Sequence, residues 1–168
     1  MVLSNYPRFG VQKMKVGFVS RLLPEKDGIA IYSDNLITNI KADIVKIGSV
    51  KSKADYNLDL KSFGLGNALK KIIKNERLDL IHIQHNAAFY SKLANLNLLL
   101  ALKQKIPVIV TLHEVHYTQN NIRDKVLSWI EKELVRKADK IIVHTPAQRR
   151  FLEEKYNAKN VENIFMGV

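Results

Sequence analysis

Short apolar runs alternate with helical patterns along most of the chain. Six apolar runs of strand length predict buried β-strands at 15–20, 43–48, 78–84, 108–112, 140–144 and 161–165. Apolar residues three or four positions apart predict five helices between them, at 29–40, 62–76, 91–103, 121–136 and 145–156. The polar segment 49–62 is expected to be a long loop. Continuously apolar strands separated by helices are typical of a parallel sheet with helices on both faces, so the pattern predicts a doubly wound, Rossmann-like α/β domain with about six strands.

Two of the predicted helices begin with residues that suit a helix cap. Thr145, Pro146 and Gln148 place a capping threonine, a proline at the first helical position and a glutamine three residues on. Together these satisfy the free amides of a helix start. Ser62 is expected to cap the helix 62–76 in the simpler way, with its hydroxyl alone.

Composition limits the class of protein and its location. The chain has 168 residues, 46% of them hydrophobic, which suits one domain with its own core. The absence of cysteine excludes disulfides, thiolate zinc sites and cysteine nucleophiles. The longest apolar runs, 98–102 and 106–110, are too short to cross a membrane. Residues 1–13 lack an apolar signal core, so we expect a cytoplasmic protein with a loose extension at 1–13 and one domain at 14–168.

The balance of charge is strongly basic. Lys and Arg number 27 against 16 acidic residues, which gives a formal net charge of +11. Such an excess favours polyanionic partners, including nucleic acid, anionic membranes and phosphorylated substrates. The excess is spread over both halves of the chain, without an RNA-recognition motif or a cluster of basic and aromatic residues. We therefore expect no specific nucleic-acid partner, and a generally basic surface explains the charge as well.

The predicted helix 62–76 allows two interpretations. Its apolar residues are Phe63, Leu65, Leu69, Ile72 and Ile73, and the basic residues around them are Lys70, Lys71, Lys74 and Arg77. A basic amphipathic helix can lie on an anionic membrane surface, here the inner face of the membrane. The favoured alternative is that the apolar side chains cover the sheet while the lysines face solvent, as in any surface helix.

Ligands of an open α/β sheet bind outside the carboxyl ends of its strands, which directs attention to the residues that follow each predicted strand. The dinucleotide fingerprint and the P-loop are both absent after the first strand. Gly28 stands at the start of the next helix, where free amides attract phosphate and a missing side chain permits close approach. A simple turn is the alternative explanation for this glycine.

Histidines stand at or near the ends of three predicted strands. His82 and Gln84 alternate onto one face of their strand, and His85 stands at its end, where it suits a substrate hydroxyl. His113 follows the next strand, which is the usual place for chemistry, and His144 ends the one after. The alternative is that they are polar residues at the rim of the sheet.

A metal site is the other chemistry that these histidines suggest. His113, Glu114 and His116 form H-E-x-H, whose spacing does not place two imidazoles on one helix face as H-E-x-x-H does. His82 and His85 lack nearby carboxylate partners. We therefore expect no bound metal.

Four segments of the chain resemble the retaining GT-B glycosyltransferases of family four. They are MKVGFVSRLLPEKDGIAIYSDNL at 14–36, LDLIHIQHN at 78–86, IPVIVTLHEV at 106–115 and ADKIIVHTPAQRRFLEEKYNAKNVENIFMGV at 138–168. They occur in the family's order and at its separations. One departure is at 164–168, where the family's I-P-x-G-V is replaced by I-F-M-G-V.

The resemblance implies the N-terminal, acceptor-binding half of a two-domain enzyme whose nucleotide-sugar is held by a C-terminal domain absent from this chain. It implies transfer of a hexose, with retention, to a glycan, a lipid-linked or a small-molecule acceptor, without a cofactor or a protein nucleophile. His113 matches the histidine beside the transferred sugar, and Gly28 matches the loop that approaches the donor diphosphate. The other residues of the same rim are Arg21, His85, Glu114 and His144. The alternative is a non-catalytic polyanion- or nucleotide-binding α/β module.

Overall fold

The computed structural model describes residues 13–101, 106–116 and 121–166. The strands in these residues form one sheet in the order β3-β2-β1-β4-β5-β6-β7, and every neighbouring pair is parallel. They are β1 (Lys15–Val19), β2 (Asp43–Ser49), β3 (Tyr56–Leu58), β4 (Leu80–His85), β5 (Val108–Leu112), β6 (Lys140–Val143) and β7 (Val161–Asn163). The predicted doubly wound α/β class is confirmed.

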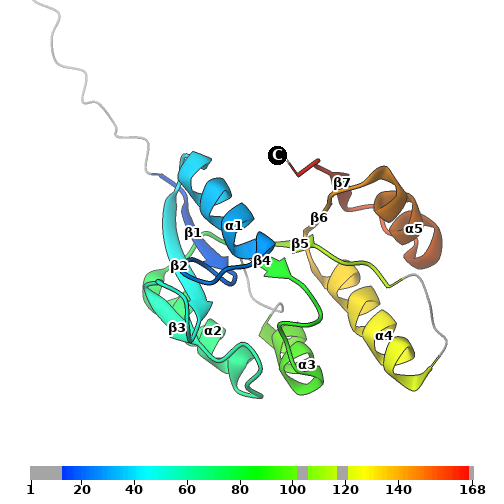
Figure 1. Cartoon of the computed structure of the whole chain (residues 1–168), viewed down its shortest axis with the longest axis horizontal. Helices are drawn as coiled ribbons and strands as arrows, with labels where there is room; N and C mark the ends of the chain where they lie inside the picture. Colours follow the sequence, from blue (N-terminus) through cyan, green and yellow to red (C-terminus); the bar gives the residue numbers. More distant parts are fainter. Residues whose placement is uncertain (1–12, 102–105, 117–120, 167–168) are drawn as a thin grey trace, which may run out of the picture.

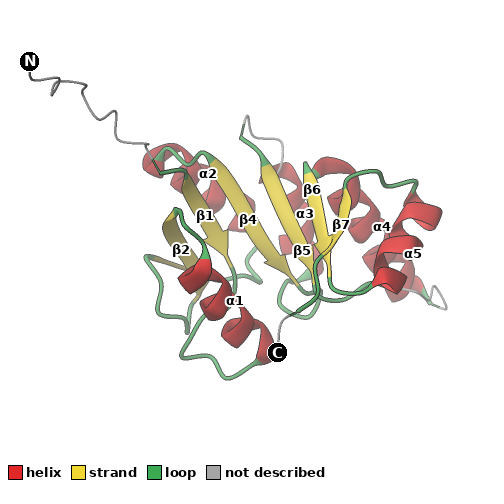
Figure 2. Ribbon diagram, turned by 90° about the horizontal axis from the view of Figure 1, so that it is seen from above, coloured by secondary structure: helices red, strands yellow, loops and turns green. Residues whose placement is uncertain are grey.

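The helices cover both faces of the sheet (Figures 1 and 2), with α1 on one face and α2, α3 and α4 on the other. Their bounds are α1 (Gly28–Asn39), α2 (Leu65–Glu76), α3 (Lys92–Ala101), α4 (Ile122–Lys137) and α5 (Pro146–Tyr156). The expected end of the third helix, at 102–103, lies outside the described residues, as does the predicted extension at 1–13 apart from Lys13. In the described part of the chain, no helix is long and apolar enough to span a membrane.

The prediction of a long loop at 49–62 is wrong in part, because β3 forms within it. Residues 56–58 pair with Ile47–Ser49 of β2 at the edge of the sheet. An edge strand is covered on fewer sides than a central one, so it needs no continuous apolar run. The two half-buried residues of β3, Tyr56 and Leu58, flank the exposed Asn57.

The start of α2 differs from the prediction, whereas the start of α5 agrees with it. The N-cap of α2 is Gly64, and the hydroxyl of Ser62 accepts a hydrogen bond from the Gly64 amide in the turn before the helix (3.1 Å). Thr145 caps α5 in a full capping box with Gln148, as predicted. A serine suits a turn as well as a cap, whereas the Thr-Pro-x-Gln combination suits a helix start alone.

The apolar side of α2 is part of the hydrophobic core. Leu65, Leu69, Ile72 and Ile73 are buried in it, and only Phe63, which precedes the helix, is exposed (64%). The side chains that an interfacial helix would insert into a membrane are therefore already packed inside the domain. This is the sheet-covering interpretation of the helix.

Candidate functional site

β1 and β4 are neighbours at the centre of the sheet, and the direction in which the chain adds strands to the sheet changes between them. From β1 the chain winds outward to β2 and β3, and from β4 it winds the other way to β5, β6 and β7. Such a switch point leaves a crevice at the carboxyl ends of the strands, where ligands of open α/β sheets bind. The residues that follow β1, β4, β5 and β6 therefore meet at one end of the sheet.

Three aromatic rings from three elements lie together at this end. Tyr32 of α1 packs edge-on against His113 after β5 and His144 after β6, with ring centroids 5.4 Å apart in both pairs. The two imidazoles have their centroids 5.0 Å apart. The structure thus brings together two of the predicted site residues, His113 and His144. It adds Tyr32, which in the sequence belongs to the apolar pattern of its helix.

His113 is held in place by hydrogen bonds to β4. Its Nε2 lies 2.8 Å from Oε1 of Gln84, a fully buried side chain, and its backbone amide donates to the carbonyl of His85 (3.1 Å). Burial, reinforced by the neighbouring His144, lowers the pKa of His113 to about 4. At neutral pH the ring is uncharged, so it offers one N–H and one bare nitrogen instead of a positive charge.

His144 links this group of rings to the segment that follows β7. Its Nδ1 donates to the carbonyl oxygen of Ile164 (3.0 Å). Its Nε2 is buried and has no hydrogen-bond partner within the described ranges. A buried polar atom without a partner next to His113 suits a group supplied by a ligand.

His85 does not join the group. It lies on the opposite face of β4 from Gln84, since successive side chains of a strand alternate. There its Nε2 lies 2.8 Å from Oδ1 of Asn95, and its ring stacks on Tyr90 with centroids 5.1 Å apart. Burial lowers its pKa, and only 5% of the residue is exposed. The sequence-based role of His85 at the substrate rim has no support in this placement.

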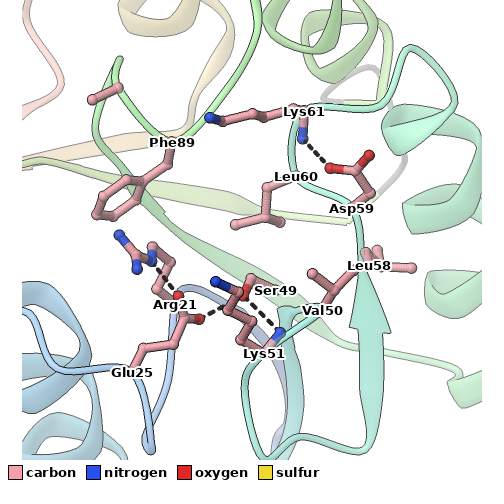
Figure 3. Close-up of a pocket in the computed structure, with 11 residues that line it drawn as sticks. Arg21, Glu25, Ser49, Val50, Lys51, Leu58, Asp59, Leu60, Lys61 and Phe89 are labelled. Atoms are coloured by element: carbon pink, nitrogen blue, oxygen red, sulfur yellow. Dashed lines mark hydrogen bonds and ion pairs between the residues drawn. The ribbon is translucent and has the colours of Figure 1, made fainter.

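Arg21 lies at the mouth of a pocket beside the carboxyl ends of β2 and β3 (Figure 3). The guanidinium pairs with Glu25 (2.5 Å) and Asp27 (3.3 Å) and stacks on the ring of Phe89 at 4.7 Å. The pocket has a volume of about 300 Å³. Its lining residues are Arg21, Glu25, Ser49, Val50, Lys51, Leu58, Asp59, Leu60, Lys61, Ala88 and Phe89.

A buried carboxylate, Glu25, organises the floor of this pocket. It accepts hydrogen bonds from the hydroxyls of Ser49 (2.5 Å) and Ser52 (2.7 Å) and from Nε of Arg21. Burial raises the pKa of Glu25, but the hydrogen bonds and the positive charge of Arg21 outweigh it, and the pKa lies below its ordinary value. Glu25 is therefore ionised at neutral pH and holds Arg21 in a fixed orientation.

The start of α1 differs from a free phosphate site. Oδ1 of Asp27 accepts hydrogen bonds from the amides of Ile29 and Ala30, both at 3.0 Å, so a carboxylate already occupies two of the amides that were expected to attract phosphate. Gly28 has no positive φ, and a Cβ there would meet nothing within 4 Å. Neither backbone conformation nor packing therefore requires glycine, and open space lies in front of it.

Glu114 and His116, the described ionisable residues that follow His113 in its loop, do not form a metal centre. Glu114 is exposed, and His116 places its Nδ1 3.0 Å from Oε2 of Glu131 on α4. This hydrogen bond raises the pKa of His116. In the ranges that the structure describes, no three histidine, aspartate or glutamate side chains are arranged to hold a metal ion.

Sequence reasoning missed several residues of this region. Glu25 and Phe89 carried no motif, and their roles depend on contacts across loops. Gln84 was placed on the correct face of its strand, but its link to His113 joins two strands whose pairing the sequence does not give. The sequence signal for this contact was the alternation of polar side chains along β4 and β5, which indicates a polar face on each strand but not which side chains meet.

Comparison with known families agrees with the geometry. The sequence model of the family described as Glycosyltransferase Family 4 matches residues 25–168. This range holds every candidate residue except Arg21, which precedes it. No curated protein matches the chain. The match covers far more than half of the sequence, so the chain belongs to Glycosyltransferase Family 4.

Proposed function

We propose that residues 14–168 are the N-terminal, acceptor-side domain of a retaining GT-B glycosyltransferase that acts in the cytoplasm. Family membership establishes glycosyl transfer in general, with a donor and an acceptor as substrates. In the proposed reaction a hexose passes from a nucleotide-sugar to a glycan, a lipid-linked or a small-molecule acceptor. A second, C-terminal domain outside these 168 residues holds most of the donor. The isolated chain is consequently expected to transfer no sugar at a useful rate.

The observation that carries this proposal is the uncharged, held imidazole of His113 at the switch point of the sheet. A neutral imidazole can bind a sugar hydroxyl without placing a positive charge beside an oxocarbenium-like centre, which such a charge would destabilise. His144, whose buried Nε2 has no hydrogen-bond partner among the described residues, adds a second imidazole beside it. Developing charge on the leaving diphosphate needs positioned donors more than a protein nucleophile.

The Arg21 side of the site suits the acceptor. The pocket in Figure 3 combines an aromatic ring, aliphatic walls and fixed polar groups, which is the usual composition of a small-molecule site. Phe89 offers its ring beside the Arg21 guanidinium, while Lys51 and Lys61 stand at the edge. We assign the acceptor to this pocket, and the donor to the side of Gly28, His113 and Glu114.

Two substitutions in the two-domain protein test this division of roles. His113→Ala is expected to lower kcat by about 10²–10³. Its loss of folding stability is expected to be about 1–3 kcal/mol, because Oε1 of the buried Gln84 is left without a hydrogen-bond donor. Phe89→Leu keeps an apolar side chain but removes the ring face, and it is expected to raise KM for the acceptor while leaving KM for the nucleotide-sugar unchanged.

Phe63→Leu is the matched control for Phe89→Leu, because Phe63 is exposed and lies outside the lining of the pocket. The control variant should behave as the unsubstituted protein. Unchanged turnover in His113→Ala would refute the role of His113. An equal rise in KM for both substrates in Phe89→Leu would refute the assignment of the pocket to the acceptor.

A further inference from the structure

Four polar side chains form a continuous chain of contacts beneath the site. Nε2 of His82 lies 2.8 Å from the hydroxyl of Thr111 and 3.1 Å from Nε2 of Gln84, and Oε1 of Gln84 lies 2.8 Å from Nε2 of His113. His82 and Gln84 are two residues apart on β4, and Thr111 and His113 are two apart along β5 and its end. Because Gln84 pairs with Thr111 in the parallel register, all four side chains lie on one face.

The chemistry of the amide decides where the protons of this chain lie. An amide nitrogen only donates hydrogen bonds and an amide oxygen only accepts them. Facing Oε1 of Gln84, Nε2 of His113 must therefore carry a proton, whereas Nε2 of His82, facing the amide nitrogen, must be bare. The hydroxyl of Thr111 then donates to the same bare nitrogen. A single amide thus sets opposite protonation on the two rings.

Burial makes this arrangement a strict one. Gln84 and Thr111 are fully buried, and His82 is 6% exposed. If a proton lay on the wrong ring nitrogen, no water could act as the missing hydrogen-bond partner. Such an unpaired buried group costs about 1–3 kcal/mol. Burial also lowers the pKa of His82 and of His113 to about 4, so each ring carries one proton at neutral pH. Each ring then has two tautomers, and only one combination fits the amide as it is placed.

We propose that Gln84 is a positioning residue that fixes His113 as its Nε2–H tautomer and ties that tautomer to the Nδ1–H form of His82. The bare Nδ1 of His113 is then a hydrogen-bond acceptor for a substrate hydroxyl. This use of Nδ1 rests on the proposed function, whereas the coupling of the two rings does not. Gln84 itself acts through His113 and touches no substrate.

The tautomers are measured on the 168-residue chain, without substrate, by long-range ¹⁵N–¹H NMR of its five histidines at neutral pH. We expect Nε2–H for His113 and Nδ1–H for His82. In Gln84→Glu the carboxylate accepts from both sides, so His82 should change to Nε2–H while His113 stays as it is. In Gln84→Leu the signals of His113 should show both tautomers.

Asn95→Leu is the matched control, because it removes the same kind of amide from His85 and leaves the four-residue chain intact. It should change the spectrum of His85 and leave those of His82 and His113 unaltered. Any other pairing of tautomers in the unsubstituted chain, or an unchanged His82 in Gln84→Glu, would overturn the proposal. The unsubstituted chain alone is decisive if Gln84→Leu fails to fold.

Turnover of the two-domain protein separates this inference from the proposed function. Gln84→Leu should lower kcat about tenfold or more, which is the size of loss that follows when the hydrogen-bond partner of a metal-ligating histidine is removed. KM should stay unchanged, and Gln84→Glu should recover part of the loss because it keeps His113 in the same tautomer. If the spectra are as expected but the His113→Ala variant is active, the proposed function is refuted and the role of Gln84 is not. If the tautomers are not coupled but the His113→Ala variant is inactive, the role of Gln84 is refuted and the proposed function is not.

Discussion

Replacing Glu25 by glutamine tests how the floor of the Arg21 pocket is held together. The substitution keeps the size of the side chain but removes the negative charge that Ser49, Ser52 and Arg21 share. Ser52 also accepts hydrogen bonds from the amides of Leu22 (2.9 Å) and Ser49 (3.1 Å), so the carboxylate supports the loop after β1 and the end of β2 together.

The expected loss follows from the number and burial of these bonds. A hydrogen bond to a charged group contributes about 1.5–3 kcal/mol, and two of them come from serine hydroxyls at the buried carboxylate. The Arg21 side chain is 31% exposed, so its ion pair adds little. A neutral amide retains part of each bond, which leaves a loss of about 3 kcal/mol. For a domain of this size the change lowers Tm by about 6–12 °C.

Urea denaturation measures this loss, with equal m values as the sign that the unfolded state is unaffected. Glu153→Gln is the matched control, because it breaks an exposed ion pair with Arg149 on α5 and should hardly change the free energy of unfolding. If Glu25→Gln were no more destabilising than Glu153→Gln, the argument from the buried carboxylate would be wrong.

The pH dependence gives a second test of the same carboxylate. Because the pKa of Glu25 is lowered in the folded state, its contribution is present above the pH at which an unfolded glutamate titrates. It is lost as the pH falls through the lower, folded pKa. The difference in unfolding free energy between the unsubstituted chain and Glu25→Gln should therefore shrink on acidification. A difference that stayed constant into acid would contradict the assignment.

Three further predictions concern other parts of the domain. Gly28→Ala should raise stability by about 0.5 kcal/mol, because the added methyl group meets open space, yet raise KM for the nucleotide-sugar; lower stability in urea would contradict this. His116→Gln should lower the free energy of unfolding by about 1 kcal/mol at about pH 6 and by less at about pH 9. The hydrogen bond to Glu131 raises the pKa of His116, so the contribution of the charged ring is lost as the pH rises through that pKa. An equal loss at both pH values would refute this prediction. When the chain is centrifuged with anionic vesicles at physiological salt, it should stay in the supernatant, because the apolar side of α2 is buried. If the chain instead sediments with the vesicles, and no longer does so after Lys70, Lys71 and Lys74 are changed to glutamine, the membrane interpretation of α2 is correct.

The sequence by itself determined the class of fold and the strand ends at which the candidate residues stand. Apolar spacing is a local property, so it predicted the order of the helices and of the strands other than β3, together with the residues at the strand ends. The period of two along a strand also placed His82 and Gln84 on one face. The Thr145 capping box was predictable because all of its partners lie within one helical turn.

Only the tertiary structure decided how these residues meet. It placed β4 beside β1 and β5, so that Gln84 lies between His82 on its own strand and His113 after the next, while Nε2 of His85 lies 2.8 Å from Oδ1 of Asn95 on α3. Strand neighbours and register depend on contacts between residues far apart in the chain, which local periodicity does not encode. For the same reason, Gln84 looks like an ordinary strand residue in the sequence, whereas in the folded domain its amide determines which nitrogen of His82 and of His113 carries the proton.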